Sequence, residues 1–122
     1  MSLTFLIVEP DPLISDDLTQ ILTGAYPGSR VVTALTSGNA ELKLVGEDSI
    51  DIAFLHVTSG ALPSDDLIKT LSGLNAHVIV LNGQGVAWTR RSVDWQFVPV
   101  PFSSGMIEEA IKRSLNDAAE MN

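Results

Sequence analysis

The chain has 122 residues, a formal net charge of −8 and no cysteine. This length fits one domain, 1–122, and a content of 45% hydrophobic and 18% charged residues indicates a globular protein rather than a disordered or fibrous one. The acidic balance argues against nucleic acid as a partner, because phosphate backbones are bound through clusters of Lys and Arg. Without cysteine, disulfides and thiolate metal sites are excluded, which is compatible with the cytoplasmic location that we expect. The apolar runs are too short to cross a bilayer, so no membrane contact is expected.

Short apolar runs alternate with helical patterns along the whole chain. Asp11 suits the N-cap of the first helix, because Pro12 at the next position loses no hydrogen bond there. Pro99 cannot donate to a β-ladder, so the strand that contains it belongs at a sheet edge. In chain order the predicted elements are a strand at 4–8, a helix at 12–24, a strand at 30–34, a helix at 37–45, a strand at 50–55, a helix at 63–74, a strand at 78–81, a short irregular helix between 83 and 94, a strand at 96–100, and a helix from Ser103 or Ser104 to about 115.

Two of these assignments are less distinct than the others. In 37–45, Ala40, Leu42 and Leu44 alternate, which fits a strand as well as a helix. The last residues, 116–122, are expected to fray.

Strands that alternate with helices predict a parallel sheet with helices on both faces. Ligands and chemistry in such folds lie beyond the carboxyl ends of the strands. The candidate site residues are those that follow these strand ends: Glu9, Pro10, Asp11, His56, Asn82 and Val100.

The pattern resembles the receiver domain of two-component response regulators over nearly the whole chain. The resemblance implies a flavodoxin-like, doubly wound sheet of five parallel strands in the order 2-1-3-4-5. The short stretch before the last strand resembles receivers with a short or irregular fourth helix. The resemblance is carried by four segments: Leu6-Ile7-Val8-Glu9-Pro10-Asp11-Pro12-Leu13-Ile14, Asp51-Ile52-Ala53-Phe54-Leu55-His56-Val57, Val78-Ile79-Val80-Leu81-Asn82-Gly83 and Val100-Pro101-Phe102-Ser103.

The residues that perform receiver chemistry are largely replaced. The family uses an aspartate nucleophile at the end of the third strand, and His56 stands there. Asn82 stands in place of a hydroxyl residue, which is a mild change. Val100 replaces the lysine that would pair with phosphoryl oxygens. The resemblance therefore implies a pseudo-receiver, with the fold but without the phosphorylation chemistry.

The acidic pair that holds Mg²⁺ in the family is also incomplete. Glu9 matches its first member, but Pro10 stands where the second belongs, and Asp11 is expected to cap the helix instead. We therefore expect no cofactor, no bound Mg²⁺ and no enzymatic activity.

His56 has two readings. An imidazole can act as a nucleophile, but the site has lost its lysine and part of its metal ligands, so phosphohistidine is disfavoured. The favoured reading is a side chain that fills the old pocket and pairs with Glu9, which would mimic neutralisation by a metal and make the pair sensitive to pH.

Three aromatic residues near the last strand, Trp88, Trp95 and Phe97, form a candidate partner face. The resemblance implies that this region meets partners, and aromatic side chains are good interface anchors. The alternative is that they pack in the core; Trp88, in a polar-flanked segment, is the best candidate for exposure.

We therefore predict a phosphorylation-independent signalling module that acts through protein contacts. The expected partner is a histidine kinase, an output protein or a second copy in a homodimer. The alternatives are a small-ligand module that uses the crevice at Glu9, His56 and Asn82, and a residual phosphoacceptor. A phosphate-bearing cofactor is disfavoured, because Glu9-Pro10-Asp11-Pro12 supplies two negative charges and two residues without an N–H.

Overall fold

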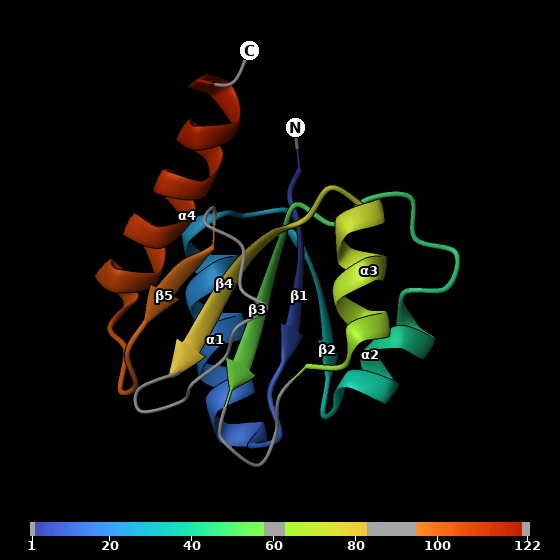
Figure 1. The fold of residues 1–122 in the computed structure, drawn as a ribbon. Coiled ribbons are helices and arrows are strands. Elements are labelled where there is room, and N and C mark those ends of the chain that lie inside the picture. The colour runs from blue at the N-terminus through green and yellow to red at the C-terminus, as the bar shows by residue number, and fades with distance from the viewer. Residues whose placement is uncertain (1, 58–62, 83–94, 121–122) are drawn as a thin grey trace.

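The computed structural model describes residues 2–57, 63–82 and 95–120. Five parallel strands form one sheet in the order β2-β1-β3-β4-β5, which confirms the predicted order (Figure 1). No helix among the described residues is long and apolar enough to cross a membrane. The elements are β1 (Thr4–Val8), α1 (Pro12–Ala25), β2 (Arg30–Ala34), α2 (Ser37–Lys43), β3 (Ile52–Val57), α3 (Asp65–Gly73), β4 (His77–Asn82), β5 (Gln96–Val98) and α4 (Ser104–Glu120).

The helices cover both faces of the sheet, α1 and α4 on one side and α2 and α3 on the other (Figure 1). Successive residues of a strand point to opposite faces, so each central strand contributes side chains to both cores. In β3, for example, Ile52 and Phe54 belong to the α1/α4 core, whereas Ala53 and Leu55 belong to the α2/α3 core. This alternation decides on which side of the sheet each functional side chain lies.

Several predicted boundaries shift in the structure. β3 runs from Ile52 to Val57 instead of 50–55, so His56 lies within the strand rather than after it. α2 ends at Lys43 rather than at Val45. β5 ends at Val98, and Pro99 follows the strand instead of lying inside it. The last helix continues to Glu120 rather than fraying from 116, and the short fourth helix predicted between 83 and 94 lies outside the described residues.

The outer edge of β2 is held by side chains from the segment that follows it. Lys43 Nζ donates a hydrogen bond to the carbonyl oxygen of Thr33 at 2.5 Å. At the start of the strand, Arg30 forms two hydrogen bonds to the Glu47 carboxylate, at 2.5 and 2.6 Å. These contacts tie the α2 segment to the edge strand.

The hydrogen bonds from Arg30, together with its charge, hold the pKa of the Glu47 carboxyl below its ordinary value of 4.5. A lowered pKa in the folded state gives stability that is present at neutral pH and is lost as the pH falls through that pKa. We therefore expect Arg30→Gln to destabilise the protein slightly at neutral pH, with the difference from wild type vanishing in acid. Urea unfolding of both proteins over a range of pH measures this; a difference that does not change with pH would contradict it.

Candidate site at the carboxyl ends of the strands

Glu9 and His56 lie at the carboxyl ends of two paired strands, on the same side of the sheet. Glu9 directly follows β1, and His56 is the last residue but one of β3. The residue before each of them, Val8 and Leu55 respectively, belongs to the α2/α3 core. Because successive residues point to opposite faces, the side chains of Glu9 and His56 lie on the α1/α4 side. Glu9 is 1% exposed, which is unusual for a carboxylate and requires a compensating partner.

His56 supplies that partner. Its Nδ1 lies 2.6 Å from Glu9 Oε1, and the two side chains are 13% and 1% exposed. Neither atom has a hydrogen-bond partner among the described residues. Each atom therefore depends on this close contact for electrostatic compensation, and the pairing predicted from the sequence is present.

The second carboxylate oxygen of Glu9 is used by the backbone. Oε2 accepts a hydrogen bond from the Asp11 amide at 3.0 Å. Asp11 Oδ1 in turn accepts from the Leu13 amide at 2.9 Å, and Asp11 is the N-cap of α1 with Pro12 as its first residue. The predicted capping role of Asp11 is confirmed.

These contacts leave a donor set that does not fit Mg²⁺. The ion needs several oxygen ligands in octahedral geometry, with carboxylates among them. Both oxygens of Glu9 are engaged, Pro10 has no side-chain oxygen, and Asp11 caps a helix. Among the described ranges, no group of three or more His, Cys, Asp or Glu side chains is placed to hold a metal ion.

The remaining strand-end residues are spread along the same edge of the sheet. Pro10 is exposed and Val100 is partly buried against the α1/α4 core. Asn82 is the last residue of β4 and pairs in register with Val57. The structure thus brings Glu9 into direct contact with both Asp11 and His56. Asn82 is placed by β4, and Val100 lies two residues beyond the end of β5.

No family model and no curated protein matches the sequence. Solved structures do match over nearly the full chain. A CheY-like response regulator receiver domain protein from Methanospirillum hungatei JF-1 is 22% identical, with 100% of both chains covered and a TM-score of 0.73. A response regulator receiver domain protein from Clostridium thermocellum is 16% identical, covering 98% of this chain and 99% of its own, with a TM-score of 0.76. The receiver domain of the hybrid histidine kinase CckA is 22% identical, covering 92% and 98%, with a TM-score of 0.70.

The chain has the receiver fold. At these identities the likeness establishes the architecture, including the sheet order 2-1-3-4-5. It also means that the Glu9–His56 pair lies at the edge of the receiver fold where the ends of β1 and β3 meet.

Two of the three residues of the candidate partner face, Trp95 and Phe97, lie in the part of the chain that the structure describes. Trp95 is half-buried and packs against the α2/α3 core, so it contributes to the core as well as to the surface. Phe97, in β5, is 45% exposed, which is high for a phenylalanine. Trp88 lies outside the described residues.

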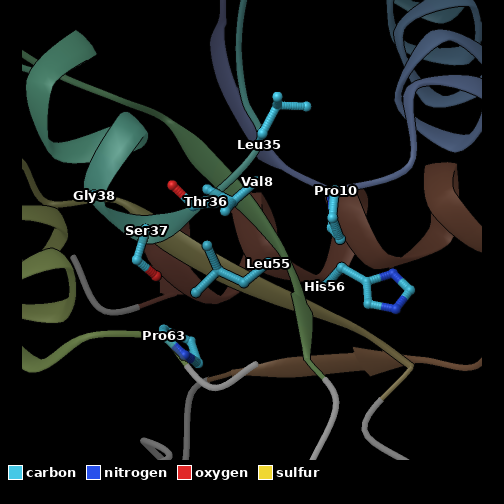
Figure 2. A pocket seen from close by; sticks show the side chains of 9 residues that line it. All are labelled: Val8, Pro10, Leu35, Thr36, Ser37, Gly38, Leu55, His56 and Pro63. Atoms are coloured by element: carbon cyan, nitrogen blue, oxygen red, sulfur yellow. The ribbon is translucent and has the colours of Figure 1, made fainter. Parts of the chain in front are cut away.

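The structure also shows a cavity that the sequence did not indicate, at the strand ends on the α2/α3 side. Figure 2 shows its lining side chains, which come from β1, β3, the start of α2 and the approach to α3. The sequence held only a weak signal for this cavity: Leu35 and Thr36 follow the end of the second strand, as Pro10 follows the end of the first. The distances between these segments depend on tertiary packing and could not be read from the sequence.

Proposed function

We propose that this chain is a phosphorylation-independent regulatory module of the two-component type, which acts through contacts with a protein partner. The observation that supports this most directly is the Glu9–His56 contact at 2.6 Å. A histidine stands at the position expected for the phosphoacceptor aspartate, and its ring is held against the carboxylate that would otherwise take part in holding Mg²⁺. The same side chain therefore removes the nucleophile and engages a metal ligand.

The proposal includes the absence of a cofactor and of enzymatic activity. Phosphoryl transfer relies on cations that offset the charge on the phosphoryl oxygens. In this chain Val100 stands at the position of the family lysine, and the carboxylates near His56 are already engaged. A phosphoryl group would also approach a protein of net charge −8.

A protein is the partner class that the surface supports. The exposed ring of Phe97 on β5 is the kind of side chain that anchors a protein interface. A histidine kinase, an output protein or a second copy of the chain would each fit such a contact. Nucleic acid is not proposed, because the chain has 7 Lys and Arg against 15 Asp and Glu.

The experiment is incubation of the protein with Mg²⁺ and acetyl phosphate, followed by measurement of its intact mass and its molar mass in solution. We expect the intact mass to stay unmodified, because His56 stands where the family has its carboxylate nucleophile and the nearby carboxylates of Glu9 and Asp11 are engaged in other contacts. A mass increase of one phosphoryl group per chain would overturn the proposal. Comparison of the molar mass with and without phosphodonor, over a wide concentration range, tests whether self-association occurs and whether it is independent of phosphorylation.

A further inference from the structure

A cavity of about 310 Å³ opens beside the ends of β1 and β3, on the side covered by α2 and α3 (Figure 2). Its size is at the lower end of small-molecule sites, which run from about 300 to 1,000 Å³. Its lining, among the residues that the structure describes, is formed by Val8, Pro10, Leu35, Thr36, Ser37, Gly38, Leu55, His56 and Pro63.

His56 is one of the lining residues of this cavity, but its contact with Glu9 lies toward the other side of the sheet. Val8 and Leu55 belong to the α2/α3 core, whereas Glu9 and His56 alternate with them and face the other side of the sheet. In Figure 2 the imidazole of His56 points away from the side chains of Leu55, Ser37 and Pro63. A ligand in this cavity would therefore leave the histidine pair in place.

Gly38 and Leu35 both line the cavity at the start of the α2 segment. Gly38, in the first turn of α2, is one of the lining residues, and a Cβ added to it would meet nothing within 4 Å. Leu35 is also part of the lining and is 57% exposed, so it presents apolar surface both to the cavity and to solvent. An exposed leucine next to an open apolar space is a surface that gains from being covered.

The wall combines apolar side chains with two hydroxyl groups. Thr36 Oγ1 accepts a hydrogen bond from the Asn39 amide at 3.1 Å, and Ser37 Oγ accepts one from the Ser64 amide at 3.2 Å. Within the described part of the chain neither hydroxyl donates a hydrogen bond, so both O–H groups are left to donate. Among the described lining residues, no Lys, Arg, Asp or Glu is present.

We propose that this cavity is a binding site for a neutral, mostly apolar small molecule that carries a carbonyl or ether oxygen. The apolar wall would cover its hydrocarbon part, and Thr36 and Ser37 would donate to its oxygen. An anion is disfavoured, because the lining offers it no cationic side chain and the protein carries a net charge of −8. The inference rests on this cavity alone and does not depend on the proposed function.

The test compares three probes of nearly the same shape: acetophenone, which is neutral with a carbonyl; ethylbenzene, which lacks the oxygen; and benzoate, which is anionic. Binding is followed through backbone amide shifts in NMR spectra. We expect saturable shifts for acetophenone at Leu35 to Gly38 and at Leu55, with an affinity in the roughly millimolar range for so small a ligand. Ethylbenzene should bind about two- to tenfold more weakly, because it cannot accept a hydrogen bond. Benzoate should bind least.

Two variants locate the site. Gly38→Leu should fill the cavity and weaken acetophenone binding by about tenfold or more, equivalent to about 1.4 kcal/mol. The matched control is Gly24→Leu, which also replaces a helical glycine whose added Cβ meets nothing within 4 Å, but lies in α1 away from the cavity. Leu35→Asp, at an exposed position, provides a second variant if Gly38→Leu fails to fold.

Each outcome decides the matter. Shifts confined to the cavity residues, lost in Gly38→Leu or Leu35→Asp and kept in Gly24→Leu, support the site. The absence of saturable shifts, or shifts that persist in both cavity variants, would overturn it. Benzoate binding as tightly as acetophenone would overturn the assignment of a neutral ligand.

Discussion

Replacing His56 with alanine is expected to lower the free energy of unfolding by about 3 kcal/mol. The substitution leaves Glu9, which is 1% exposed, without the group that compensates its Oε1 atom. Removing one member of a buried pair typically costs about 3–5 kcal/mol, because the other charge stays buried and unpaired. We place the cost at the lower end because the histidine side chain is 13% exposed, so water can reach the space that it vacates. Urea unfolding measures the change.

A second background separates electrostatics from packing. In Glu9→Gln the carboxylate is replaced by an amide of the same shape, so the same His56→Ala substitution should cost only the lost packing, about 1 kcal/mol. The double-mutant cycle then yields a coupling of about 2 kcal/mol between the two side chains. Equal costs of His56→Ala in both backgrounds would mean that the histidine stabilises the fold by filling space and not by pairing with Glu9.

Replacing His56 with aspartate is expected to make the stability of the protein depend on Mg²⁺. The new carboxylate would lie close to that of Glu9, and two such groups in a buried site repel one another unless a cation lies between them. Without metal the variant should be less stable than wild type. Mg²⁺ at roughly ten- to thirtyfold above its dissociation constant should then restore about 1–2 kcal/mol.

The matched control is His56→Asn, which has the same shape as the aspartate variant without the charge. The unfolding midpoint of this variant, like that of wild type, should be the same in buffer with Mg²⁺ and in metal-free, EDTA-treated buffer. If the aspartate variant also shows no response to Mg²⁺, position 56 is not what prevents metal binding, and Pro10 or the engagement of Asp11 as helix cap would have to account for it.

Much of the architecture followed from local patterns. β1 and β2 have the predicted bounds, because their apolar runs are short and ended by clear turn residues. The start of α1 was also predicted correctly, since an aspartate followed by a proline has a local physical meaning as a cap. The sheet order came from the resemblance to receiver domains and is confirmed.

The predicted end of β3 was wrong, and the reason lies in the contact between His56 and Glu9. A histidine after an apolar run reads as the end of a buried strand, yet the strand continues through His56 to Val57. The continuation is possible because Glu9, which directly follows the neighbouring strand β1, compensates the polar ring. Such compensation depends on a residue 47 positions away in the sequence, so only the tertiary structure reveals it.

The cavity escaped prediction for a related reason. Its walls come from segments that are distant in the sequence, and one of its lining residues, Gly38, has no side chain. A glycine near a helix start reads equally well as a turn residue. The place of Gly38 in the cavity wall becomes apparent only in the tertiary structure.

The two edge strands that form the borders of the sheet affect the tendency of this protein to aggregate at high concentration. Exposed strand borders can recruit further strands and start fibrous aggregates. Here the Lys43 ammonium group occupies a carbonyl on the outer border of β2, while β5 has only 3 residues and is followed at once by Pro99. Within the described ranges, the Lys43 contact and the shortness of β5 leave no long run of backbone groups at either border. Concentrated solutions should therefore resist fibril formation.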